Sequence, residues 1–211
     1  GAVVAVDIND GSIVTYVSSP SFSVNKIANG LTQNEFDELI NDDDKPFFDR
    51  AAQGRYSPAS TIKPAIGLFG IDKDILDWEY TIQDPGFFIL PEDGRIYRGW
   101  KKGGHGEINL KDAIIESSNT FFFSLAYQTE IEELRAHLSN FGFGKNVCDD
   151  CFMPDNGLLP SPRWKMNTHN FGWFKGDTVN VGVGQGYINA TPIQLAYYSA
   201  FLATKGNINK F

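Results

Sequence analysis

Ser60 and Lys63 stand three residues apart at the start of an apolar segment, residues 65–69, that is typical of a buried helix. Residues three apart on a helix share a face, so the amine of Lys63 is expected to reach the hydroxyl of Ser60. Pro58 restricts the approach to this helix, and Pro64 falls near its first turn, where a missing N–H costs least.

This pairing suggests nucleophilic chemistry. A serine hydroxyl is a poor nucleophile until a base removes its proton, and a buried lysine becomes such a base when desolvation lowers its pKa. A helix N-terminus adds N–H groups where negative charge would develop. The structural alternative is that Ser60 caps the helix and Lys63 is solvated.

The spacing alone is weak evidence, because Ser23 and Lys26 repeat it. Ser23 precedes a polar segment, residues 26–30, which we expect to be a loop. A second polar group, residues 117–119 (Ser-Ser-Asn), precedes another apolar helix and offers a hydroxyl and an amide to an active site.

Several segments carry a resemblance to a known family. Ser60–Lys63 and Ser117–Asn119 resemble the first two motifs of the penicillin-binding transpeptidases. Three further segments are similar to the class B enzymes of the penicillin-binding protein 2 group: Asp49–Gly54, Trp100–Gly106 and Gly182–Gln194. The resemblance extends nearly from end to end of the chain.

The resemblance implies an α+β fold in which a helical subdomain packs on an antiparallel sheet. Residues 1–211 would form part of a transpeptidase domain, with the membrane anchor and pedestal domain of the family outside this chain. The third family motif, Lys-Thr/Ser-Gly, is missing; Lys205-Gly206 reads only as a helix end. We expect the strand that carries this motif to follow Phe211, so that the sheet is incomplete here. Ala59 stands where the family usually has glycine.

The resemblance also implies the roles of four residues. Ser60 would attack the penultimate D-Ala of a peptidoglycan stem peptide, with Lys63 as its general base. Ser117 would relay the proton to the leaving amine, and Asn119 would hold the donor peptide. The Ser60 N–H would supply half of an oxyanion hole. Because losing one oxyanion donor costs on the order of 10²–10³ in rate, we expect the 211-residue chain alone to be nearly inactive.

The expected partners follow from the same resemblance: stem peptides ending in D-Ala-D-Ala, β-lactams that mimic them, and a glycosyltransferase of the cell-elongation machinery. The expected location is the periplasmic face of a bacterial inner membrane. A formal net charge of -8 argues against nucleic acid as a partner. No cofactor is expected.

Some relatives of this family hold zinc beside the active site, and the matching positions are Asp84, Gly99, His105 and Ser118. Gly99 has no side chain to coordinate a metal and Ser118 is a poor zinc ligand, so we expect no zinc. We expect His105 to hydrogen-bond within its glycine-rich turn. The acidic run 42–44 lacks a calcium-loop spacing and is expected to be a solvated turn.

Cys148 and Cys151 are the only cysteines. Such a pair can be half a zinc site, a redox pair or a local disulfide. No second pair follows at zinc-finger spacing, and an oxidising compartment favours the disulfide over free thiols.

The remaining pattern predicts a hairpin and several helices. Strands are expected at residues 3–6 and 13–17, joined by Asn-Asp-Gly, and at 87–90. Helices are expected at 35–40, 109–116, from about 120, from 131 to a stop at Gly142, and from Thr191-Pro192 to Gly206. The last helix should bury one face, formed by Ile193, Ala196, Tyr197, Ala200 and Phe201. Residues 158–175 are expected to be an ordered loop.

Two other functions remain open. A serine β-lactamase or β-lactam sensor shares the Ser-x-x-Lys motif, although no glutamate is placed like the deacylating base of the class A enzymes. A non-catalytic scaffold for the elongation machinery is the alternative outside enzymes.

Overall fold

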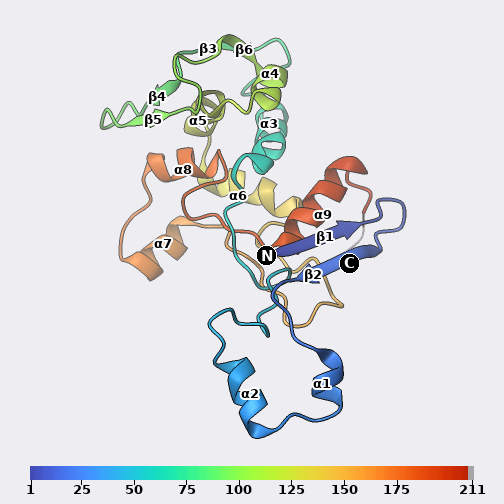
Figure 1. Ribbon diagram of the computed structural model, residues 1–211. Helices are drawn as coiled ribbons and strands as arrows, with labels where there is room; N and C mark the ends of the chain where they lie inside the picture. The colour runs from blue at the N-terminus through green and yellow to red at the C-terminus, as the bar shows by residue number, and fades with distance from the viewer. Residues whose placement is uncertain (209–211) are drawn as a thin grey trace. The chain divides into compact units, whose positions relative to one another are not determined.

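The computed structural model describes residues 1–208, which form two compact units (Figure 1). Unit 1 contains residues 1–56, 142–157 and the segment from Ala190 onward, and unit 2 contains residues 57–141 and 158–189. Within the described part, no helix is both long enough and apolar enough to cross a bilayer. The four residues with predicted catalytic roles all belong to unit 2.

A β-hairpin and one long helix pack together in unit 1. The strands β1 (Ala2–Val6) and β2 (Ile13–Ser18) pair antiparallel, and helix α9 (Pro192–Ala203) packs against β1. The turn residue Gly11 has a φ of 81°, a conformation that glycine adopts without strain. The predicted hairpin is therefore confirmed, with strand ends within one residue of those expected.

Helix α9 begins as predicted, but its predicted buried face is confirmed only in part, because Ile193 and Ala200 are buried whereas Ala196 is half-buried. Thr191 and Gln194 form a reciprocal capping box at its first turn. Tyr197 and Phe201 are only half-buried, whereas Tyr198 and Gln194 are buried. Gln194 is tolerated there because its amide nitrogen lies 2.8–3.2 Å from three main-chain carbonyl oxygens, which accept its two hydrogens and so satisfy a buried polar group.

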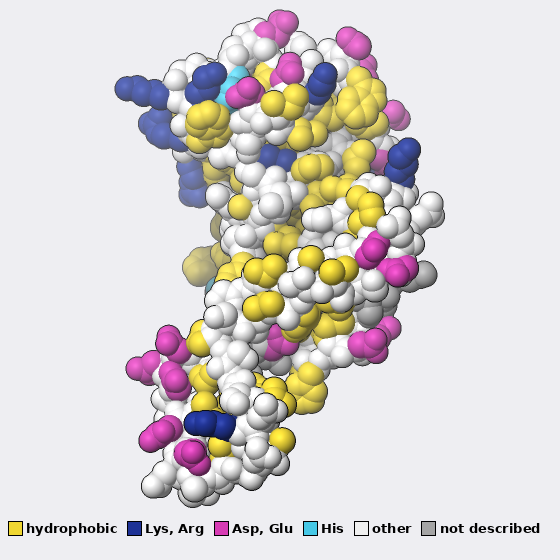
Figure 2. Space-filling view, turned by 45° about the vertical axis from the view of Figure 1, so that its right-hand side comes forward, with side chains coloured by type: hydrophobic (Ala, Val, Ile, Leu, Met, Phe, Trp, Pro, Cys, Tyr) yellow, Lys and Arg dark blue, Asp and Glu magenta, His cyan; other side chains and the backbone are white. Residues whose placement is uncertain are grey.

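Two short helices, α1 (Val24–Ala28) and α2 (Gln33–Ile40), contain no buried residue. The prediction of α2 is confirmed, but the loop expected after Ser23 is wrong in part, because α1 occupies it. Ser23 Oγ caps α1 by accepting the N–H of Lys26. Figure 2 shows acidic side chains gathered on the segment formed by α1, α2 and the acidic turn 42–44 that follows α2.

Cys148 and Cys151 form a disulfide, as predicted. Cys148 is buried in a small core cluster with Val147 and Ile193. The bond closes a loop of only a few residues, so it restricts the unfolded chain little and contributes little to stability.

Unit 2 is mainly helical, and α5 (Asn119–Tyr127) lies at its centre. It packs against α3 (Lys63–Asp72), α4 (Leu110–Ile115) and α8 (Lys175–Val181) and buries three consecutive phenylalanines, 121–123. Each buried phenylalanine contributes about 1.5–3 kcal/mol by leaving water. The other helices of the unit are the 3₁₀ turn η1 (Ala59–Ile62), α3 (Lys63–Asp72), α4 (Leu110–Ile115), α6 (Ile131–Asn140), α7 (Pro162–His169) and α8 (Lys175–Val181).

The loop expected at residues 158–175 is wrong, because it contains α7. Ser161 Oγ accepts the N–H of Trp164 and Pro162 occupies the first turn, while Asn170 ends the helix in a left-handed conformation. The aromatic and glycine content of the segment obscured these capping signals.

Two small antiparallel strand pairs complete unit 2. Strand β3 (Thr81–Asp84) pairs with β6 (Gly106–Asn109), and β4 (Phe87–Ile89) pairs with β5 (Ile96–Arg98). Asp84 lies opposite Gly106 at the end of the first pair. This register brings Asp84 and His105 together, as the site below requires.

Candidate active site

Ser60 lies on the 3₁₀ turn η1, immediately before helix α3, rather than in the α-helix itself. The residue is exposed, and neither η1 nor α3 has a side-chain cap. The structural alternative for Ser60, a helix cap, is therefore wrong. Its hydroxyl can therefore act as a nucleophile at the N-terminus of α3, where the first main-chain N–H groups of a helix have no partner within the helix.

The main chain immediately before Ser60 is held by another loop. Ala59 has a φ of 49°, and its N–H donates to the carbonyl of Gly184 at 2.9 Å. A Cβ atom on Gly184 would lie 2.2 Å from the carbonyl oxygen of Ala59, so only glycine permits this approach. The loop that contains Gly184 thus fixes the position of the segment that carries the serine.

Lys63 is the first residue of α3 and is 1% exposed, so the alternative of a solvated lysine is also wrong. Its Nζ donates to Ser117 O at 2.7 Å, to Ser117 Oγ at 3.0 Å and to Asn119 Oδ1 at 2.8 Å. An ammonium group has three hydrogens, and these three acceptors match them. Three of the four predicted residues are therefore joined directly.

Ser60 is not part of this hydrogen-bonded group within residues 1–208. Its carbonyl oxygen accepts the backbone N–H of Lys63, but no bond joins its Oγ to Lys63 Nζ. The expected contact between hydroxyl and amine is thus not formed in this conformation. The serine stands one helical turn from the amine, and catalytic bonds are often absent before substrate is bound.

The charge state of Lys63 follows from its surroundings. Burial lowers the pKa of Lys63 from 10.5 to about 8. Its three acceptors are neutral, and the ring of Phe122 lies 5.4 Å from Nζ. With no carboxylate among these partners to hold the proton, the amine loses it far more easily than an exposed lysine does.

Ser117 and Asn119 reach Lys63 from the short connection between α4 and α5. Ser117 has a φ of 53°, which is uncommon for a residue with a side chain, and directs both its carbonyl and its hydroxyl to Lys63. Ser118 caps α5 by accepting the N–H of Phe121 at 3.2 Å, and Asn119 is the first residue of that helix.

Ser118 belongs to a second buried polar cluster, with Asp84 and His105, that shares no hydrogen bond with Lys63 in the described residues. Its hydroxyl donates to Asp84 Oδ2 at 2.8 Å, and His105 Nδ1 lies 2.6 Å from the same oxygen. Burial alone would raise the pKa of Asp84, but hydrogen bonds from His105, Gly86 N–H and Ser118 hold it below its usual value. His105 therefore bonds across the strand pair rather than within its own turn.

These residues do not fit a zinc site. Two ligands of one tetrahedral zinc lie roughly 3.3 Å apart, farther than Asp84 Oδ2 and His105 Nδ1. Gly99 brings no ligand, and the Ser118 hydroxyl is used by Asp84. No group of three or more His, Cys, Asp or Glu side chains suited to a metal occurs among residues 1–208. The donor set supports the prediction of no zinc, which stays a prediction.

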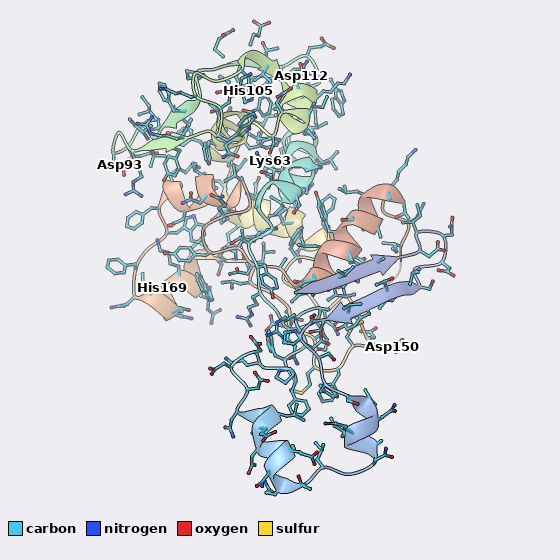
Figure 3. The ribbon with its side chains drawn as sticks, in the orientation of Figure 1. Lys63, Asp93, His105, Asp112, Asp150 and His169 are labelled. Carbon is cyan, nitrogen blue, oxygen red and sulfur yellow. A yellow bond between two sulfur atoms is a disulfide. The ribbon has the colours of Figure 1, made fainter. Side chains whose placement is uncertain are left out.

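Sequence reasoning missed two parts of this site. One is the contact of Gly184 with Ala59; the glycine-rich run 182–186 was the available signal. The other is the link from Asp84 to Ser118, for which the position of Ser118 between two predicted site residues was the only signal. Figure 3 labels Lys63 and His105 in the part of unit 2 that holds both groups of contacts.

The chain is similar to known proteins over its whole length. A family model described as "Penicillin binding protein transpeptidase domain" matches residues 1–211. The peptidoglycan D,D-transpeptidase MrdA of Acinetobacter baumannii is 43% identical over 207 residues, which cover 98% of this chain but 31% of that protein.

Two solved structures are also similar. The crystal structure of PBP2 from Pseudomonas aeruginosa in complex with WCK 5153 has 40% identity and a TM-score of 0.95, over 100% of this chain and 46% of that one. A structure on the coordination of polymerization and crosslinking by a peptidoglycan synthase complex has 29% identity and a TM-score of 0.86, over 97% of this chain and 35% of that one.

Proposed function

Because this chain belongs to the penicillin-binding protein transpeptidase family, we propose that it carries the acylation site of a peptidoglycan D,D-transpeptidase. The reaction is acyl transfer through an ester on Ser60. The mixed α+β fold, with its helical part and incomplete sheet, is that of the transpeptidase domains it resembles. The curated relative is about three times longer, so activity and partners are assigned here to the whole protein.

In the proposed first step, neutral Lys63 takes the proton of Ser60 while Ser60 Oγ attacks the carbonyl carbon of the penultimate D-Ala of a stem peptide. The C–N bond to the terminal D-Ala then breaks, and Ser117 passes a proton from Lys63 to the departing amine. Asn119 holds the donor peptide through its side-chain amide. An amine of a second stem peptide then attacks the Ser60 ester, which forms the crosslink and frees the serine.

One observation supports this assignment above the others: Lys63 is buried and hydrogen-bonded to both Ser117 and Asn119. With a pKa of about 8, its amine is close to the value at which a base is most effective near neutral pH. A positioned base of this kind contributes about 10²–10⁴ in rate. The bond between Ser117 Oγ and Lys63 Nζ also supplies the route for the proton.

The same site would be acylated by β-lactams, because their reactive amide mimics the D-Ala-D-Ala end. We place the protein at the periplasmic face of the inner membrane, where stem peptides are crosslinked. We also infer a glycan-polymerising partner, in keeping with the peptidoglycan synthase complex whose structure this chain resembles.

The test is covalent labelling of the whole protein with a fluorescent penicillin, followed by peptide mapping by mass spectrometry. We expect one adduct, on Ser60, that persists for minutes to hours. The variant Ser60→Ala should lose the label, whereas Ser23→Ala should keep it. Labelling at another residue, or labelling that Ser60→Ala retains, would contradict the proposal. An adduct that hydrolyses within seconds would indicate a β-lactamase instead.

A further inference from the structure

The connection between α4 and α5, residues 117–119, is hydrogen-bonded to Asp84, which also contacts His105. The proposed reaction assigns no role to this polar cluster. Ser118 separates the two site residues, and its side chain is fully buried. Ser117 and Asn119 contact Lys63, whereas Ser118 donates its hydroxyl hydrogen to Asp84. Three consecutive residues thus connect the amine of Lys63 with a buried carboxylate.

Asp84 is itself fixed. It is 3% exposed and ends strand β3. One carboxylate oxygen accepts the N–H of Gly86 at 2.7 Å, and the other accepts from Ser118 at 2.8 Å and lies 2.6 Å from His105 Nδ1. His105 is held in turn, because its own N–H donates to the carbonyl of Asp84 at 3.1 Å. A carboxylate bound on both oxygens is a rigid anchor.

The main-chain conformation of Ser117 has to be stabilised by its surroundings. Its φ of 53° is a conformation that costs energy for a residue with a Cβ atom and persists only where the surroundings enforce it. The hydrogen bonds from Ser117 N to Ile114 O and from Ser118 N to Ala113 O fix the side toward α4. On the side toward the strands, the Ser118 hydroxyl supplies the link to Asp84.

We propose that Asp84, His105 and Ser118 are positioning residues that hold Ser117 in its left-handed conformation and thereby align Ser117 and Asn119 with Lys63. This inference rests on the proposed function, since it concerns the same acylation. None of the three touches the substrate. Their effect passes through the main chain of residues 117–119, and no metal is required.

The consequence is kinetic. If the link is cut, Ser117 relaxes toward an ordinary conformation and its Oγ moves away from Lys63. Displacements of about 1 Å at a reacting group cost on the order of 10² in rate. The main loss should fall on the acylation step at saturating antibiotic, because Ser117 passes the proton in that step. Reversible binding should weaken less, because Asn119 remains the first residue of α5.

The experiment compares two serine caps in the whole protein. Ser118→Ala removes a buried cap and the bond to Asp84. Ser161→Ala removes a buried cap of the same kind, bonded to Trp164 N at 2.9 Å, in the same unit. With a fluorescent penicillin as the probe, we expect Ser118→Ala to slow saturated acylation about 10–100-fold, with a much smaller change in the half-saturating concentration, and Ser161→Ala to leave both constants unchanged.

Further variants separate positioning from capping. Asp84→Asn retains the cap on α5 but weakens the anchor and should slow acylation as Ser118→Ala does. The double variant should be no slower than the slower single variant, because both changes remove one interaction. His105→Asn, which keeps a donor near the place of Nδ1, should acylate faster than His105→Ala. Treatment with a zinc chelator should leave the rate unchanged.

Two outcomes would overturn the inference while the proposed function stands: equal acylation rates for Ser118→Ala and Ser161→Ala, or loss of activity with the chelator. Absence of any label on Ser60 of the unmodified protein would overturn the proposed function instead. A crystal structure of Ser118→Ala decides the positioning role without any activity. There we expect Ser117 to lose its positive φ, and an unchanged Ser117 would refute the inference.

Discussion

Two segments of this chain share the Ser-x-x-Lys spacing, but the structure gives them opposite surroundings. Ser23 caps α1 by accepting the N–H of Lys26, in a helix with no buried residue. Ser60 makes no cap, and Lys63 is almost fully buried with its amine bonded to Ser117 and Asn119. The spacing brings a hydroxyl and an amine to one helical turn in both places. Only burial, and a second element that meets the lysine, makes the pair suitable for acyl transfer.

The largest expected difference between the segments is in their lysines. Lys63→Met should slow acylation of the whole protein by a fluorescent penicillin by about 10³-fold or more, because it removes the proposed base. Lys26→Met is the matched control and should leave the rate unchanged. A similar loss in both variants would mean that the two segments do not differ as described.

A second test changes the charge beside Lys63. Asn119→Asp would place a carboxylate where the amide oxygen now lies, 2.8 Å from Nζ, and so raise the pKa of Lys63. The rate at pH 7 should fall about tenfold or more, because a smaller fraction of the amine is neutral. Measuring the rate from pH 6 to 10 separates this shift from a simple loss of activity, since the lost rate should return at high pH. An equally low rate at every pH would contradict the assignment.

The unmodified protein should itself show a pH-dependent rate. Burial lowers the pKa of Lys63 to about 8, so the protonated, inactive amine dominates below that value and the neutral base above it. The acylation rate should therefore rise about tenfold from pH 7 to pH 9 and then level off. Subtracting the spontaneous hydrolysis of the antibiotic provides the control. A rate that is flat across this range, or that falls, would count against Lys63 as the base.

The smallest expected effect is that of removing the cap at Ser23, in the segment that contains Lys26. Ser23→Ala should cost about 1 kcal/mol of helix stability in α1 through loss of its cap. Because α1 contains no buried residue, the loss should stay local. Hydrogen exchange should become faster for residues 24–28, while the melting temperature and the acylation rate remain unchanged. A clear drop in the melting temperature would show that α1 supports the fold more than its exposure indicates.

Much of this fold could be predicted from local patterns. The Asn-Asp-Gly turn predicted the hairpin of β1 and β2, and the Thr191-Pro192 pair predicted the start of α9. The disulfide followed from the cysteine spacing and an oxidising compartment. These features depend on residues close together in the chain, where turn geometry and capping decide the outcome.

Features that depend on distant residues were harder to predict. The helix α7 was missed because its aromatic residues and flanking glycines obscured the cap at Ser161. The buried face of α9 was predicted only in part, because Gln194 is also buried, with its amide bonded to carbonyls 38 to 52 residues away. The contacts of Lys63 with Ser117 and Asn119 span more than 50 residues, and the resemblance to a family suggested them. Burial of the amine follows from the packing of α3 against α5, which no local pattern shows.

The contact between Ala59 and Gly184 determines how this site tolerates mutation. The two residues meet through their main chains, so any residue except proline could donate this N–H at position 59, although the φ of 49° there favours glycine or a small side chain. Position 184 has no such freedom, because any side chain would collide with the carbonyl of residue 59. A substitution at position 184 should therefore displace the segment that carries Ser60, so variation that preserves the serine's position is confined to other residues.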